Sequence, residues 1–116
     1  MLSFKSILPL ALGLLYITAV SMADNCSSGV HMIVARESLA KPGMGLIGAV
    51  AQSVQQQIPG SDIVAVDYPA QLNPQVPSEA AGVAAMSKLV ADYVAACPMS
   101  KIVLMGYSQF KSPLAL

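Results

Sequence analysis

The chain has 116 residues, no net formal charge, a hydrophobic fraction of 55% and only 10% charged residues. Because lysine and arginine do not cluster, nothing in this composition favours nucleic acid or an anionic membrane as a partner. One histidine and two cysteines do not form a cluster with zinc spacing, so no metal site is expected.

Residues 1–23 have the three-part layout of a secretory signal peptide. Lys5 lies in a short start, residues 7–20 are almost wholly apolar, and Ser21-Met22-Ala23 form a small-residue cleavage site. A membrane anchor is the alternative, but this apolar stretch is shorter than the roughly 20 residues that a spanning helix needs. We therefore expect a secreted chain that begins near Asp24 and is long enough for one small domain.

Three elements are predicted in the first half of the mature chain. Val30 to Ala35 are nearly all apolar, as expected for a strand that is buried on both faces. Between Met44 and Gln57 the pattern predicts a helix, because apolar residues recur three and four positions apart. This stripe consists of Leu46, Ile47, Val50, Val54 and Ile58. Pro59-Gly60 ends the helix, and Asp62 to Val66 are predicted to form a second buried strand.

A second helix and a third strand follow a proline-rich loop. Ser78 is predicted to be the helix N-cap, with Glu79 in the first turn, where a negative charge favours the helix dipole. The apolar face of this helix consists of Val83, Met86, Val90 and Val94, with Leu89 and Tyr93 beside it. Cys97-Pro98 ends the helix, and Ile102 to Met105 form the third strand.

The alternation of strands and helices predicts the α/β class, with a parallel sheet inside a three-layer αβα sandwich. An even number of cysteines in a secreted chain indicates a disulfide, here between Cys26 and Cys97. Each cysteine precedes a strand, so the bond would place the first and third strands side by side and the second outside them. This is the 2-1-3 order of a flavodoxin-type sheet, which binds ligands at the carboxyl ends of the strands where the order reverses.

The third strand leads into Gly106-Tyr107-Ser108, which points to a nucleophilic serine. In serine hydrolases a Gly-x-Ser turn lifts the serine clear of the sheet between a strand and a helix. An ordinary turn serine is the alternative, and the buried strand before Ser108 favours the nucleophile. The developing oxyanion would need donors. The amide of Gln109 is one candidate, and the hydroxyl or amide of Ser38, in the loop after the first strand, is another.

No general base for Ser108 is found in the sequence. In this class of hydrolase an acid and then a histidine follow the serine, but neither occurs after Ser108. His31 begins the first strand, roughly 16 Å from its carboxyl end at about 3.3 Å per residue, and is expected to be structural. Asp62 and Asp67 flank the second strand and are expected to cap its ends.

Four segments together resemble the N-terminal half of the fungal cutinase and acetylxylan esterase family (carbohydrate esterase family 5). They are Val-His-Met-Ile-Val-Ala-Arg-Glu-Ser at 30–38, Pro-Gly-Met-Gly at 42–45, Val-Asp-Tyr-Pro-Ala at 66–70 and Cys-Pro-Met-Ser-Lys-Ile-Val-Leu-Met-Gly-Tyr-Ser-Gln at 97–109. A cysteine eleven residues before the serine is also typical of that family.

The resemblance implies a secreted, cofactor-free serine esterase of α/β-hydrolase fold, which hydrolyses esters of plant polymers through an acyl-enzyme. Ser108 would be the nucleophile, Ser38 and Gln109 the oxyanion hole, and Cys26 and Cys97 the disulfide. The partner would be cutin or acetylated xylan, acted on by a monomer that has no contact with membranes or nucleic acid after signal cleavage. Arg-Glu-Ser after the first strand resembles the acetylxylan esterase type.

The family continues with a glycine after Gln109, where this chain has Phe110. We therefore expect residues 24–109 to form the N-terminal half of such a domain, truncated after the third strand, and residues 110–116 to be a non-homologous tail. Without the acid and the histidine, the chain is expected to be inactive as written. A non-catalytic secreted protein that binds the plant cell wall on the same scaffold is the alternative function.

Overall fold

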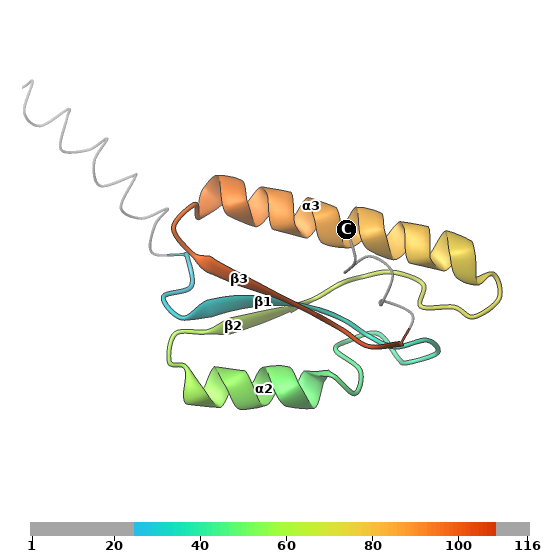
Figure 1. The fold of residues 1–116 in the computed structure, drawn as a ribbon, viewed down its shortest axis with the longest axis horizontal. Helices are drawn as coiled ribbons and strands as arrows, with labels where there is room; N and C mark the ends of the chain where they lie inside the picture. Colours follow the sequence, from blue (N-terminus) through green and yellow to red (C-terminus); the bar gives the residue numbers. More distant parts are fainter. Residues whose placement is uncertain (1–24, 109–116) are drawn as a thin grey trace, which may run out of the picture.

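The computed structural model describes residues 25–108, so the predicted signal peptide, Gln109 and the tail at 110–116 lie outside the described residues. Within these described residues, three strands alternate with two helices (Figure 1). The elements are β1 (Val30–Ala35), α2 (Gly48–Gln57), β2 (Asp62–Ala65), α3 (Gln75–Ala96) and β3 (Lys101–Gly106).

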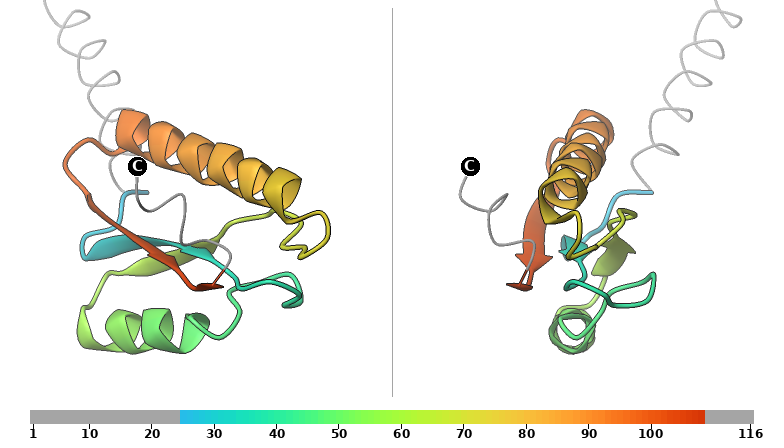
Figure 2. Two further views of the ribbon diagram at one scale, coloured as in Figure 1. Left: turned by 45° about the vertical axis from the view of Figure 1, so that its right-hand side comes forward. Right: turned by 90° about the vertical axis from the view of Figure 1, so that its right-hand side faces the viewer.

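The sheet is parallel and has the order β2-β1-β3, which confirms the predicted α/β topology. α3 covers one face and α2 the other, so the molecule has three layers (Figures 1 and 2). The register pairs His31 with Asp62 on β2, and Val30 with Lys101 through Ala35 with Gly106 on β3. β1 is therefore the central strand and aligns the other two.

Side chains of β1 fill both interfaces of the sandwich. Met32, Ile33, Val34 and Ala35 are fully buried, as the nearly continuous apolar run predicts. Because successive side chains in a strand point to opposite faces, Met32 and Val34 pack with Ala51 of α2. Ile33 and Ala35 belong to the other cluster.

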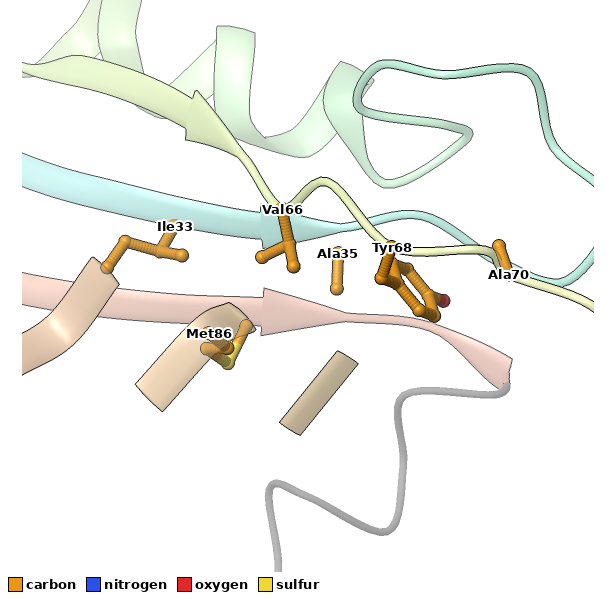
Figure 3. Packing of buried hydrophobic residues seen from close by; sticks show 6 residues of the cluster. All are labelled: Ile33, Ala35, Val66, Tyr68, Ala70 and Met86. Carbon is orange, nitrogen blue, oxygen red and sulfur yellow. The ribbon is translucent and has the colours of Figure 1, made fainter. Parts of the chain in front are cut away.

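The cluster on the α3 side extends along the sheet to its carboxyl edge. Its buried members are Ile33, Ala35, Val66, Tyr68, Ala70 and Met86, and Met86 is the contribution of α3 (Figure 3). The loop after β2 supplies three of them, since Val66, Tyr68 and Ala70 follow the strand directly. The core thus reaches the edge of the sheet where the site residues are expected.

The predicted disulfide is present between Cys26 and Cys97, with Cα atoms 5.6 Å apart. It ties the segment before β1 to the segment before β3, at the amino end of the sheet. Within residues 25–108, neither helix combines the length and apolar character of a membrane span.

Two predictions about the first half of the chain are wrong in detail. The first helix begins at Gly48 and not at Met44, because Gly45 has a φ of 67° and residues 46–47 form a turn. Of the predicted stripe, Leu46 lies before the helix and is 74% exposed, and Val50 lies inside the helix but is still 50% exposed. The second strand is half-buried and not fully buried, and it ends at Ala65 because it lies at an edge of the sheet.

The predicted N-cap of the second helix is also wrong. α3 begins at Gln75, and Pro74 is its N-cap residue. Ser78 is therefore inside the helix, and Glu79 lies beyond its first turn. Pro77 is tolerated there because the first residues of a helix have no intrahelical partner for their N–H groups. The Ser78 hydroxyl is buried and accepts a hydrogen bond from the backbone N–H of Gln71, at 2.8 Å.

Candidate active site at the carboxyl edge of the sheet

The carboxyl ends of β1 and β3 bring the predicted site segments to the same edge. Ala35 and Gly106 are paired across the two strands. Ser38 follows Ala35 by three residues, and Ser108 follows Gly106 by two. The segments that carry the two serines therefore follow the carboxyl ends of β1 and β3, at the opposite end of the sheet from the disulfide. Ser38 is partly buried and Ser108 is exposed.

Ser108 has left-handed backbone geometry, with a φ of 63°. A residue with a Cβ atom is uncommon in this region, and its presence there costs about 1–3 kcal/mol unless the surroundings hold it. Such a strained turn directly after a strand is the geometry that exposes the serine of a hydrolase nucleophile elbow. The role of Ser108 stays a prediction, and its backbone fits that role.

Two further non-glycine residues of the described chain, Leu39 and Ala70, also have a positive φ, of 67° and 51°. Both follow strands at the carboxyl edge, and they are joined by a hydrogen bond of 2.7 Å from the Leu39 N–H to the Ala70 carbonyl. Backbone strain of this kind clusters at functional sites, where the surrounding contacts hold it in place. The loop after each of the three strands thus contains a non-glycine residue with a positive φ.

Arg36, the first residue after β1, is buried, with only 5% of its surface exposed. Its Nε donates to the Ala40 carbonyl at 2.9 Å, and its Nη2 donates to the carbonyls of Tyr68 at 2.6 Å and Pro69 at 3.4 Å. Among residues 25–108 no carboxylate forms an ion pair with this guanidinium. A buried positive charge therefore lies two residues before Ser38 and is bound by carbonyl dipoles.

Tyr68 completes a reciprocal contact with Arg36. Its hydroxyl donates to the Arg36 carbonyl, while the Arg36 side chain donates to the Tyr68 carbonyl. The guanidinium carbon lies 5.2 Å from the centre of the Tyr68 ring. Burial raises the pKa of the Tyr68 hydroxyl above its ordinary value, and the charge of Arg36 opposes this shift. We call this pair of residues the Arg36–Tyr68 clasp.

Glu37 fixes the other side of the loop. Both of its carboxylate oxygens accept the backbone N–H of Leu46 at 3.0 Å, and the side chain packs against Gly45. Ser38 lies between this contact and the hydrogen bond from Leu39 to Ala70. The predicted oxyanion donor is therefore in a loop that is held on both sides.

His31 lies at the other end of β1, as predicted. Its ring stacks on Tyr93 with centroids 3.6 Å apart and an interplanar angle of 3°, and its Nδ1 is 2.7 Å from an Asp62 carboxylate oxygen. Asp62 thus pairs with His31 at the amino end of the sheet. Neither side chain reaches the carboxyl edge, and residues 25–108 contain no cluster of three or more histidine, cysteine, aspartate or glutamate side chains able to hold a metal ion.

Sequence reasoning did not assign a role to Arg36 or Tyr68, although both lie in segments that carry the resemblance. The available signal was an arginine directly after a nearly continuous apolar strand, where a charged side chain needs polar partners if the loop leaves it buried. The position of Tyr68 gave no comparable signal.

Comparisons with known proteins agree on one family. The family model described as Cutinase matches residues 26–111. Acetylxylan esterase 2 of Talaromyces purpureogenus is 36% identical over 95 residues, which cover 76% of this chain and 41% of that protein. Cutinase 11 of Verticillium dahliae is 33% identical over 93 residues, or 74% of this chain and 31% of that protein.

Solved structures show the same relationship. An acetyl xylan esterase refined at 0.90 Å matches with a TM-score of 0.69 and 37% identity, over 73% of this chain and 44% of its own length. The catalytic core domain of acetyl xylan esterase from Trichoderma reesei matches with a TM-score of 0.68 and 29% identity, over 73% of this chain and 45% of its own. The chain thus spans less than half the length of these relatives.

Proposed function

The chain belongs to the cutinase family, and we propose that it carries the nucleophile and the oxyanion-binding loop of a secreted serine carboxylic-ester hydrolase. The single observation that supports this most is the left-handed backbone of Ser108, directly after a strand whose neighbour leads into Ser38. The proposal takes residues 24–109 as the esterase portion, residues 1–23 as its signal peptide and residues 110–116 as a tail, although the family model extends two residues into that tail, to residue 111.

In the proposed reaction the Ser108 Oγ attacks the carbonyl carbon of the ester and gives its proton to a general base. The carbonyl oxygen becomes an oxyanion, which the amide of Gln109 and the hydroxyl or amide of Ser38 would stabilise. The carbon–oxygen bond to the alcohol then breaks, and the alcohol leaves with that proton. Water then takes the place of the alcohol: it attacks the acyl carbon of the acyl-enzyme and gives a proton to the base. The bond to the Ser108 Oγ breaks, the acid is released and Ser108 regains its proton.

Within residues 25–108, no histidine lies at this edge to act as the general base. The sequence has one histidine, His31, and it lies with Asp62 and Tyr93 at the amino end of the sheet. A serine hydroxyl without a base remains protonated and reacts slowly. We therefore expect these 116 residues alone to have little esterase activity, and we expect added imidazole to act as an external base for Ser108.

We propose esters of plant cell-wall polymers as the substrate class, since one relative is named for acetylxylan and another is named a cutinase. Acetylated xylan and cutin differ in the acid that is released, which is acetate from the first and long-chain hydroxy acids from the second. Incubation with each polymer, with imidazole present, distinguishes the two.

Covalent labelling tests the role of Ser108. A fluorophosphonate should label Ser108 at least tenfold faster than Ser87, an exposed serine on α3 that serves as an internal control. Peptide mass spectrometry locates the label, and Ser108→Ala should remove it. Equal labelling of the two serines, with imidazole present, would contradict the proposal.

The distance between His31 and the carboxyl edge also supports a second candidate function, binding of the cell-wall polymer without catalysis. In that case Ser108→Ala should sediment with insoluble cutin or acetylated xylan as strongly as the parent chain. The parent should also release no acid from either polymer when imidazole is added.

A further inference from the structure

We infer that Arg36 and Tyr68 are positioning residues, which hold the loop of Ser38 in the shape that binds an oxyanion. The inference rests on the proposed function and adds to it two side chains that would not touch the substrate. It follows from how these side chains hold the loop at residues 36–41, here called the Ser38 loop.

The Arg36–Tyr68 clasp joins two loops that follow neighbouring strands. The two residues are 32 positions apart in the sequence, and each side chain donates to the backbone carbonyl of the other. Because both contacts are buried, a shift of either loop would leave a guanidinium and a carbonyl without partners. An unpaired buried polar group costs about 1–3 kcal/mol, and more if it is charged. The clasp therefore resists displacement of the Ser38 loop.

Contacts to other segments hold the residues on both sides of Ser38. Arg36 is bound to the loop after β2 and Glu37 to the Leu46 amide, while the hydrogen bond from the Arg36 side chain to Ala40 closes the loop on itself. Leu39 donates to Ala70 despite its unfavourable φ. An oxyanion hole stabilises charge best when its donors are in place before the reaction, since no free energy is then spent on reorganising them.

The charge of Arg36 adds an electrostatic reason. Its guanidinium is buried, and within the described residues it is matched by carbonyl oxygens and the Tyr68 ring but by no carboxylate. The neighbouring Glu37 is bound to the Leu46 amide. A positive charge that no anion neutralises favours negative charge developing nearby, more so where water is excluded.

If Ser108 is replaced by cysteine, oxyanion stabilisation at this edge of the sheet can be measured without a general base. Cysteine has a pKa of about 8.5, so roughly half of an unperturbed thiol is thiolate at that pH. With p-nitrophenyl acetate, the thiolate sulfur introduced by Ser108→Cys bonds to the carbonyl carbon, the carbonyl oxygen becomes an oxyanion, and p-nitrophenolate leaves with the bonding electrons. With iodoacetamide, the sulfur displaces iodide and no oxyanion forms.

The ratio of the acylation rate to the alkylation rate therefore isolates oxyanion stabilisation. Thiolate content and accessibility affect both rates and cancel in the ratio. Ser87→Cys on the exposed face of α3 provides the reference ratio for a thiol with no oxyanion hole. We expect the ratio at position 108 to exceed that reference at least tenfold.

Tyr68→Phe, made on the Ser108→Cys chain, removes only the hydroxyl of the clasp. We expect it to lower the ratio about tenfold, because a displacement near 1 Å at a reacting centre can cost up to about 10²-fold. Arg36→Gln should lower the ratio further, and Arg36→Lys, which keeps the charge, should recover part of the loss.

Tyr93→Phe is the matched control, because the Tyr93 hydroxyl also accepts a partly buried hydrogen bond, from the Ser27 N–H at 2.8 Å, but lies at the amino end of the sheet. It should reduce stability without changing the ratio. Urea unfolding and intact mass show that each variant is folded and singly labelled.

The outcomes separate the two claims. If the ratio at position 108 is no higher than at position 87, the oxyanion site itself is refuted, and the inference with it. If that ratio is high but is unchanged by Tyr68→Phe and Arg36→Gln, or falls equally in Tyr93→Phe, only the positioning role is refuted. A fall confined to the clasp variants supports it.

Discussion

Removal of the disulfide is the perturbation whose effect can be calculated most directly from the structure. The bond joins Cys26 to Cys97 across a sequence separation of 71 residues and closes the amino end of the β1–β3 pair. Because Cys97 is buried, both cysteines are replaced by alanine, as Cys26→Ala and Cys97→Ala, since serine would place a hydroxyl in the core. The native contacts of the sheet remain, and the main change is in the unfolded chain.

A closed loop of this length lowers the entropy of the unfolded chain by about 15 cal/mol/K, which is about 4 kcal/mol at 25 °C. A domain of this size has a free energy of unfolding on the order of 4 to 12 kcal/mol. The bond therefore accounts for a third or more of the expected stability. With a urea dependence of about 1–2 kcal/mol/M, the unfolding midpoint should fall by about 2–4 M.

Urea unfolding followed by circular dichroism measures this change. The parent chain reduced with dithiothreitol is the control, and it should unfold at the same midpoint as the double variant. A double variant that unfolds within about 0.5 M of the oxidised parent, with an unchanged slope, would refute the calculation. It would mean that the unfolded chain is already compact or that the bond strains the native state.

Three further predictions concern single side chains. Leu39→Gly should be more stable than Leu39→Ala by about 1 kcal/mol, because φ is positive at residue 39. In α2 the order should reverse, with Gln56→Gly less stable than Gln56→Ala by a similar amount. If the difference in urea midpoint between the glycine and alanine variants had the same sign at both sites, the prediction would be contradicted. Because burial raises the pKa of folded Tyr68, its stabilising effect is complete below about pH 10 and is lost as pH rises through the folded pKa. Tyr68→Phe should therefore lose less stability between pH 9 and 11 than the parent, and equal losses would argue against it. His31→Phe should lower the free energy of unfolding by about 1–2 kcal/mol, because the contact with Asp62 is lost. The rate at which a fluorophosphonate labels Ser108 should not change, and slower labelling would indicate a catalytic histidine.

The sheet order was predictable because a covalent constraint links distant parts of the sequence. Cys26 and Cys97 each precede a strand, and a bond between them leaves only one arrangement for β1 and β3. The central position of β1 also follows from its sequence, since a nearly uninterrupted apolar run is stable only when both faces are covered.

The helix boundaries were less predictable because local signals compete with tertiary contacts. Ser78 has the chemistry of an N-cap, but in the fold its hydroxyl accepts a hydrogen bond from the N–H of Gln71, and the helix begins at Gln75. At α2 the apolar stripe continues upstream of the helix, although Gly45 adopts a conformation that no helix allows. At α2 the apolar spacing therefore predicted the presence of a helix, but neither its first residue nor all of its buried face, since Leu46 and Val50 are exposed.

The pairing of Arg36 with Tyr68 could not be predicted from local sequence. Arg36 and Tyr68 interact through backbone carbonyls, so neither partner requires a complementary side chain at a recognisable spacing. The left-handed geometry of Leu39 and Ala70 was not predictable either, since neither residue is glycine or asparagine, whereas the Gly-x-Ser motif did indicate a sharp turn at Ser108. Such strain is visible only once the surrounding contacts are known.

The proposed site depends most of all on the register between β1 and β3. Ala35 pairs with Gly106, and this pairing determines which residues leave the sheet together. A slip of one residue would move Ser108 about 3.3 Å along the strand and turn every side chain of β3 to the opposite face. Ile102 would then leave the α3 cluster, and Val103 and Met105 would leave the α2 cluster. The packing of the two helices thus excludes the slipped arrangement, so the alternating apolar residues that build the core also align the candidate nucleophile with the Ser38 loop.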